Sequence, residues 1–121
     1  MNVLFVCTLN KARSVAAERL YRRIPGLSVR SAGISPRARH QLGELDLQWA
    51  DWVIVFDAAQ ERWIRETFAG ELPRISDVGI SDDYLADDPE LLVQLRECLT
   101  PLLGPAPGPA TPAPRRCQRG D

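Results

Sequence analysis

Histidine, lysine and methionine are almost missing from this chain of 121 residues, which has one histidine and one methionine. A single histidine, His40, excludes zinc sites built from several histidines, and we assign His40 no catalytic role. The three cysteines, Cys7, Cys98 and Cys117, are too few, and odd in number, for a disulfide framework. No apolar run approaches the roughly 20 residues that cross a bilayer, and the N-terminus lacks the basic region of a signal peptide. We therefore expect a cytoplasmic protein without a membrane partner.

The net charge of −1 conceals a separation of charge along the sequence. Residues 1–40 carry eight basic side chains and one acidic one, whereas residues 41–100 carry four arginines and fourteen acidic side chains. Such asymmetry accompanies the binding of anions or nucleic acids in some proteins. In others, the basic and acidic parts of one fold neutralise each other's charge, and this is the interpretation we favour. The sole lysine, Lys11, lies in the basic part.

The predicted elements alternate between strand and helix along residues 1–103. Val3–Val6 and Trp52–Phe56 are wholly apolar, which is typical of strands buried on both faces. Further strands are predicted over 27–31 and 72–77, and helices over 14–23, 41–49, 58–69 and 89–103, with Ser14 and Asp88 in capping positions. The alternation predicts a single α/β domain, a doubly wound four-stranded parallel sheet in the order 2-1-3-4 with helices on both faces. Residues 104–121, rich in proline and alanine, are predicted to form a disordered tail.

The pattern Cys-x5-Arg-Ser, from Cys7 to Ser14, lies between the first predicted strand and the first helix. A loop this short can turn successive backbone N–H groups toward one centre, and the helix N-terminus adds positive potential there. A cysteine at the start of such a loop lies beneath the bound anion and is expected to be a thiolate at neutral pH. Arg13 can bind two oxygens of the anion, and Ser14 can donate its hydroxyl to the sulfur. The pattern therefore predicts an oxyanion site with a cysteine nucleophile.

The stretch from Val3 to Tyr21 resembles the N-terminal signature of the low-molecular-weight protein tyrosine phosphatases. Residues 31–33 are similar to the end of that family's second strand, 49–57 to its third strand and the turn after it, and 77–84 to its acid loop. The resemblance covers residues 2–103. It implies a phosphatase that hydrolyses phosphomonoesters, namely phosphotyrosine or another aryl phosphate, with a phosphoprotein as substrate. The reaction would pass through a cysteinyl-phosphate and need no metal or cofactor.

Carried over to this chain, the resemblance implies that Cys7 is the nucleophile, that Arg13 binds the phosphoryl oxygens and that Asp82 is the general acid. Asp83 is the competitor of Asp82 for that role. Other residues expected to order the loop or to contact the substrate are Thr8, Leu9, Asn10, Lys11, Ala12, Ser14 and Tyr84. Of these, Asn10 and Ser14 order the loop and the thiolate, and Tyr84 could stack on an aryl leaving group.

Several positions depart from the family's pattern. Leu9 replaces a glycine and is expected to strain the loop, and Ala12 replaces a second cysteine that protects the nucleophile from over-oxidation. Asp83 replaces a proline beside the expected acid. The segment after Gly33 is shorter than the family's cleft wall, which weakens the expectation of a preference for phosphotyrosine.

Three alternatives to this prediction stay open. An arsenate reductase uses the same loop but needs resolving cysteines near the acid loop, where Cys98 and Cys117 do not lie. A non-catalytic module that only binds oxyanions would tolerate both Leu9 and Asp83. A phosphatase acting on a nucleotide or RNA phosphate would suit the basic first third, but no stacking platform for RNA is present, so a nucleic-acid partner is not expected.

Overall fold

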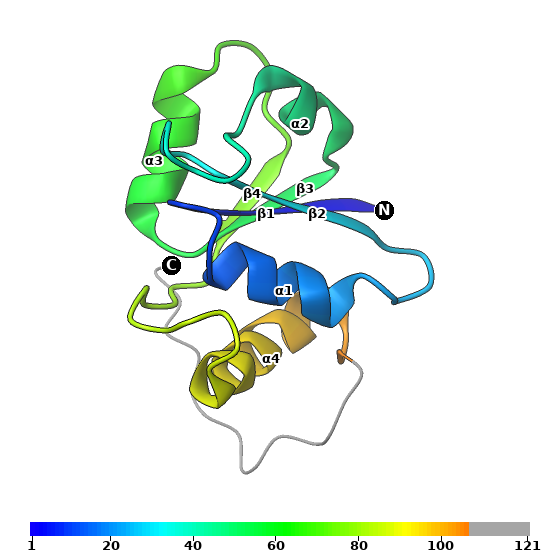
Figure 1. Ribbon diagram of the computed structural model, residues 1–121. Coiled ribbons are helices and arrows are strands. Elements are labelled where there is room, and N and C mark those ends of the chain that lie inside the picture. The colour runs from blue at the N-terminus through cyan, green and yellow to red at the C-terminus, as the bar shows by residue number, and fades with distance from the viewer. Residues whose placement is uncertain (107–121) are drawn as a thin grey trace.

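The computed structural model describes residues 1–106, which form a central sheet between two layers of helices (Figure 1). The strands are β1 (Asn2–Cys7), β2 (Ser28–Gly33), β3 (Trp52–Val55) and β4 (Arg74–Asp77), and the helices are α1 (Arg13–Tyr21), α2 (Glu44–Trp49), α3 (Ala58–Thr67) and α4 (Pro89–Leu103). All neighbouring strands are parallel, in the order β2-β1-β3-β4, so the predicted topology is confirmed. Most of the predicted tail, including Cys117, lies outside the described residues.

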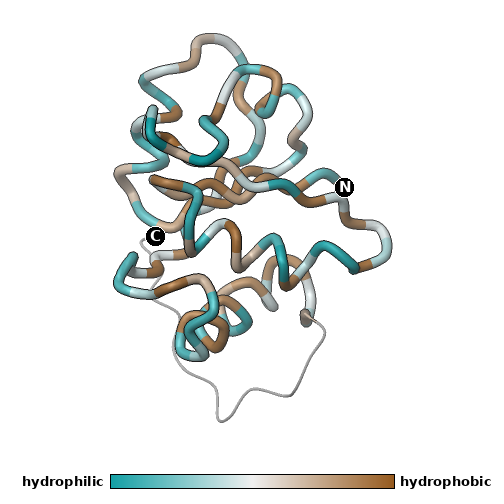
Figure 2. Tube along the Cα trace, viewed as in Figure 1, coloured by the Kyte–Doolittle hydropathy of each residue, from teal (hydrophilic) through white to brown (hydrophobic). Residues whose placement is uncertain are grey.

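The central strand β1 supplies side chains to two separate cores, because successive residues of a strand point to opposite faces of the sheet. Val3, Phe5 and Cys7 pack with α1 and α4 on one face, and Leu4 and Val6 pack with α2 and α3 on the other. Hydrophobic residues are accordingly concentrated along the strands in Figure 2. This two-sided burial explains the continuous apolar run at the start of the sequence. None of the helices within residues 1–106 has the length and apolar character needed to cross a membrane.

The first helix begins one residue before its predicted start. α1 starts at Arg13, and Ala12 at the N-cap position provides no side-chain cap. Ser14, the predicted cap, is fully buried and its hydroxyl contacts the sulfur of Cys7 instead. The prediction of a Ser14 cap is therefore wrong, because the side chain is used in the site described below.

The second helix begins later than predicted, at Glu44. Gln41 forms a parallel bridge with Gly33, and the N–H of Leu42 donates to the carbonyl of Gly33 at 2.8 Å. These contacts draw residues 41 and 42 alongside the end of β2, so they cannot enter the helix. The start of α4 agrees with prediction, since the carboxylate of Asp88 accepts from the N–H of Glu90.

Gly33 ends β2 where the chain passes closest to the β1–α1 loop (residues 8–12). A Cβ atom at this position would lie 2.6 Å from the carbonyl oxygen of Thr8 and 2.9 Å from the backbone nitrogen of Asn10. Such distances are well below van der Waals contact. Only glycine therefore lets the two backbones approach as they do.

Gly33→Ala is expected to lower the free energy of unfolding by about 1–3 kcal/mol, because the added methyl group displaces the β1–α1 loop. Gly43→Ala is a matched control, since a Cβ atom there would meet only the Oδ2 atom of Asp46, at 3.9 Å. We expect a cost below about 1 kcal/mol for the control. Urea denaturation measures both, and equal losses would contradict close approach as the reason for glycine at position 33.

Candidate active site

The backbone of the β1–α1 loop is held from outside by residues 34–39, here called the brace. Three amides of the brace donate to three successive carbonyls at the end of β1 and in the loop. The bonds join Ile34 N to Cys7 O (3.0 Å), Ser35 N to Thr8 O (3.0 Å) and Arg39 N to Leu9 O (3.3 Å). The carbonyls of this segment are therefore turned away from the centre of the loop.

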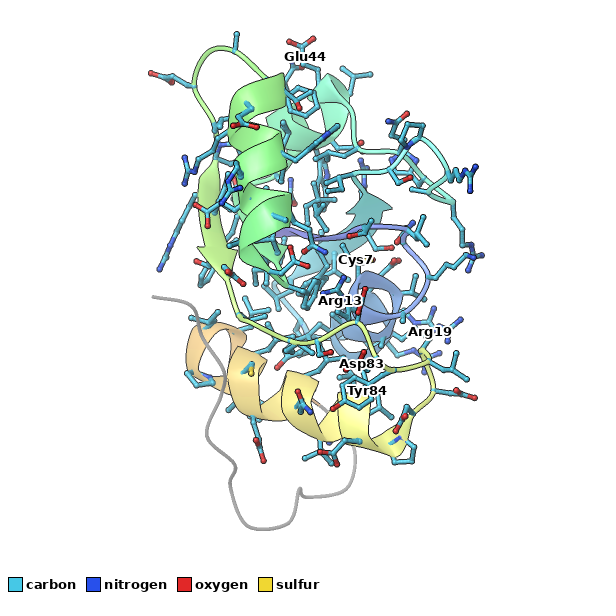
Figure 3. The ribbon with its side chains drawn as sticks, turned by 90° about the vertical axis from the view of Figure 1, so that its left-hand side faces the viewer. Cys7, Arg13, Arg19, Glu44, Asp83 and Tyr84 are labelled. Atoms are coloured by element: carbon cyan, nitrogen blue, oxygen red, sulfur yellow. The ribbon has the colours of Figure 1, made fainter. Side chains whose placement is uncertain are left out.

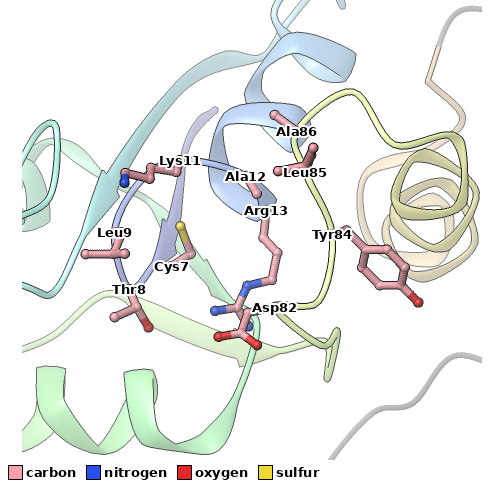
Figure 4. Close-up of a pocket in the computed structure, with 10 residues that line it drawn as sticks. All are labelled: Cys7, Thr8, Leu9, Lys11, Ala12, Arg13, Asp82, Tyr84, Leu85 and Ala86. Atoms are coloured by element: carbon pink, nitrogen blue, oxygen red, sulfur yellow. The ribbon is translucent and has the colours of Figure 1, made fainter.

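The amides of the same loop are left without protein partners. Within residues 1–106, no backbone N–H of residues 8–13 donates to a protein acceptor. The sulfur of Cys7 lies inside the arc that the loop traces (Figure 4). Several unpaired N–H groups around one point, at the N-terminus of α1, form a nest that can bind a tetrahedral oxyanion directly above that sulfur.

Three buried side chains form a hydrogen-bonded chain beneath the loop. Ser14 Oγ lies 2.9 Å from Cys7 Sγ and donates to Asn10 Oδ1, also at 2.9 Å. Asn10 has a φ of 54°, and it is the only non-glycine residue of positive φ among the described residues. Asparagine tolerates this left-handed conformation better than most side chains do.

The strain expected from Leu9 is not observed. The left-handed position of the loop falls one residue later, at Asn10, so Leu9 does not need the freedom of glycine. Its side chain is 37% exposed and lines the pocket over the nest.

Arg13 is held by two segments that follow strands β3 and β4. Its side chain is 4% exposed, and Nη1 donates to Asp57 Oδ2 at 3.2 Å and to the carbonyl of Ile80 at 2.9 Å. The guanidinium carbon lies 5.9 Å from the centre of the Phe56 ring. These contacts fix the guanidinium beside the nest before any anion binds.

Asp57 serves two partners with its two carboxylate oxygens. Oδ2 accepts from Arg13, while Oδ1 accepts from the N–H of Gln60 at 2.9 Å and so caps α3. Our sequence analysis missed both Asp57 and Gln60. The signal was present, because Asp-x-x-Gln directly after an apolar strand resembles the pattern that begins capped helices.

A cavity of about 270 Å³ opens over the nest. It is lined by Cys7, Thr8, Leu9, Lys11, Ala12, Arg13, Asp82, Tyr84, Leu85 and Ala86 (Figure 4). The cavity thus brings together all the predicted site residues except the buried pair Asn10 and Ser14, which lie beneath the loop. Figure 3 shows the labelled residues Cys7 and Arg13 next to the segment that carries Asp83 and Tyr84, far from Glu44 on α2.

The two neighbouring carboxylates of the loop before α4 have different surroundings. Asp82 lines the cavity, as do Cys7 and Arg13 (Figure 4). Asp83 does not line it, and its Oδ2 atom accepts a hydrogen bond from the hydroxyl of Ser81 at 2.7 Å. Of the two, only Asp82 faces the nest.

Tyr84 lies at the rim of the cavity, but its ring is turned toward α4 (Figure 4). The hydroxyl accepts a hydrogen bond from Gln94 Nε2 at 2.7 Å. To stack on a leaving group, as the sequence predicts, the ring would have to give up this contact.

Lys11 and His40 both lie at the surface of the protein. Lys11 is exposed at the edge of the cavity. His40 Nε2 lies 3.1 Å from both carboxylate oxygens of Asp46, on the surface. Within residues 1–106, no group of three or more histidine, cysteine or acidic side chains is arranged to hold a metal ion.

Several solved structures, phosphatases among them, share this architecture. No family model and no curated sequence matches the chain. The low-molecular-weight protein tyrosine phosphatase of Streptococcus pyogenes matches 84% of this chain and 93% of its own, with a TM-score of 0.70 and 19% identity. YfkJ of Bacillus subtilis matches 85% and 92%, with a TM-score of 0.66 and 24% identity. The chain has the fold of the low-molecular-weight protein tyrosine phosphatases.

A third similar structure is that of a phosphatase named for a different substrate. The YwlE arginine phosphatase of Geobacillus stearothermophilus is 26% identical, with a TM-score of 0.50. The match covers 55% of this chain and 59% of that protein, so this chain spans about three fifths of its length. The low-molecular-weight phosphatase fold is thus established for the chain, whereas the similar structures differ in what they act on.

Replacing Asp57 separates its two tasks. Asp57→Ala removes the cap of α3 and is expected to lower the free energy of unfolding by about 1–2 kcal/mol, whereas Asp57→Asn keeps a capping oxygen and should cost less than half of that. Both variants should bind inorganic phosphate more weakly, because Arg13 loses one of its two anchors. Urea denaturation and calorimetric titration measure the two effects. Equal losses of stability in both variants would contradict the capping role.

Proposed function

We propose that the protein hydrolyses phosphomonoesters through a phosphocysteine formed on Cys7. The observation that carries this proposal is the burial of Cys7 Sγ beneath a nest of unpaired amides, next to a guanidinium that is already held in place. A nest of this kind stabilises the charge on a phosphoryl group as it is transferred, because its donors need no rearrangement.

The first step transfers the phosphoryl group to sulfur. The Cys7 thiolate attacks phosphorus, the S–P bond forms and the bond from phosphorus to the ester oxygen breaks. Asp82 in its protonated form gives its proton to that oxygen, and the alcohol or phenol leaves. Arg13 and the amides of the β1–α1 loop hold the non-bridging oxygens throughout.

The second step releases inorganic phosphate. Asp82, now a carboxylate, takes a proton from a water molecule whose oxygen attacks phosphorus, and the S–P bond breaks. Ser14 Oγ lies 2.9 Å from the sulfur, and once its proton turns from Asn10 Oδ1 to the sulfur it donates a hydrogen bond to the thiolate that leaves. Asp82 ends protonated and the thiolate is restored, so the cycle is complete.

The walls of the cavity support an aryl phosphate, such as phosphotyrosine in a protein, as substrate. Leu9 and Leu85 are 37% and 76% exposed, and both line the cavity, as does Ala86. Exposed apolar side chains above an anion site favour a leaving group with an apolar face.

Arginine phosphate is the second candidate substrate. The similarity to an arginine phosphatase favours it, and the exposed carboxylate of Asp82 at the cavity would attract a guanidinium leaving group. Values of kcat/KM for phosphotyrosine and phosphoarginine peptides of the same sequence distinguish the two, and a higher value for phosphotyrosine supports the first candidate.

The alternatives to phosphatase activity have less support. Arsenate reduction needs a second thiol within reach of Cys7, and Cys98 does not line the cavity, being buried on α4. A module that only binds oxyanions has no need for a carboxylate facing the nest, where Asp82 lies.

Three variants test the proposed chemistry with p-nitrophenyl phosphate. Cys7→Ser should abolish turnover, and Asp82→Asn should lower kcat by ~10²–10⁴, because the leaving oxygen loses its proton donor. Asp83→Asn is the matched control and should keep most of the activity. Turnover that survives in Cys7→Ser, or an Asp83→Asn variant slower than Asp82→Asn, is incompatible with these roles.

A further inference from the structure

Gln60 is a fully buried amide that joins α3 to the β1–α1 loop. Its Oε1 atom accepts from the backbone N–H of Phe56 at 2.7 Å, and its Nε2 atom lies 3.3 Å from Thr8 Oγ1. A backbone N–H can only donate, so the atom that it meets must be the amide oxygen. The orientation of the amide is thereby fixed, and the nitrogen must face Thr8.

The direction of the second hydrogen bond follows from the first. An amide nitrogen only donates, so the Thr8 hydroxyl is the acceptor in its contact with Gln60. The proton of that hydroxyl has no protein acceptor anywhere in residues 1–106. Thr8 also lines the cavity that holds Cys7, and it is the first residue after the nucleophile. A hydroxyl donor thus lies unused at the wall of an anion site.

We propose that Thr8 donates its hydroxyl proton to a non-bridging oxygen of the bound phosphoryl group. Gln60 is the positioning residue, because its amide occupies the acceptor side of the hydroxyl and leaves the proton free to point into the cavity. This side-chain donor would add to the backbone amides and Arg13. The inference rests on the proposed oxyanion site but not on turnover, so phosphate binding can test it separately.

The binding of inorganic phosphate, measured by isothermal titration calorimetry, tests the role of Thr8. Thr8→Val keeps the shape of the side chain but removes the hydroxyl, and its dissociation constant should rise by ~10-fold, the loss of a hydrogen bond to a charged group. Thr8→Ser keeps the hydroxyl and should bind within about 3-fold of the wild type. Circular dichroism and urea denaturation confirm that the compared variants are folded.

A double-mutant cycle tests the role of Gln60. Gln60→Glu still offers an oxygen to the Phe56 N–H, but its other oxygen accepts the Thr8 proton and turns it away from the cavity. The added negative charge also weakens phosphate binding, and it does so equally in the Thr8→Val background. The loss of affinity from Gln60→Glu should therefore be ~10-fold larger with Thr8 present than in that background.

The outcomes separate this inference from the proposed function. Equal phosphate affinity in Thr8→Val and the wild type would overturn the role of Thr8, even if the enzyme hydrolyses esters. Equal losses of phosphate affinity from Gln60→Glu, with Thr8 present and in the Thr8→Val background, would show that the orientation of the Thr8 proton does not matter. Gln60 would then only anchor the loop. A wild-type protein that binds phosphate with the expected dependence on Thr8, but hydrolyses no ester, supports the inference and contradicts the proposed function.

Discussion

The hydrogen bonds between the brace and the β1–α1 loop are the constraint on which the rest of the site depends. Because Ile34, Ser35 and Arg39 bind the carbonyls of three successive residues, the amides that follow are turned inward and stay unpaired. Unpaired amides are costly in a buried place, so such a loop is stable only where water or an anion can reach them. Gly33 permits this arrangement, since any side chain there would collide with Thr8.

The remaining parts of the site come from segments that follow the other strands of the parallel sheet. Ligands of such sheets bind beyond the carboxyl ends of the strands, where these segments meet. Asp57 follows β3 and Ile80 follows β4, and both anchor Arg13. Asp82 extends from the same segment as Ile80, so the guanidinium and the proposed acid are held by one stretch of backbone. Movement of that stretch would therefore disturb phosphoryl binding and proton transfer together.

The topology of the sheet and the loop with Cys7 and Arg13 were predictable, because both follow from local patterns of apolar residues and spacing. The details that failed depend on contacts between distant parts of the chain. The helix expected at Gln41 is displaced by pairing with Gly33, and the cap expected at Ser14 is lost to the Cys7 sulfur. The cap of α3 left a signal in the sequence and the predicted strand order places α3 near the loop, but the contact between the Gln60 and Thr8 side chains depends on side-chain orientations that no local pattern gives. The individual roles assigned to the site residues stay predictions.

Trapping the covalent intermediate is the most direct test of the central claim, that the nest presents a phosphoryl group to Cys7. The Asp82→Asn variant should slow release of phosphate, so acid quenching during turnover of p-nitrophenyl phosphate should preserve the intermediate. Peptide mass spectrometry should then find the added mass of one phosphoryl group on the peptide that contains Cys7, and on no other. Turnover without any adduct on Cys7, or with the phosphoryl group on another residue, would contradict the account.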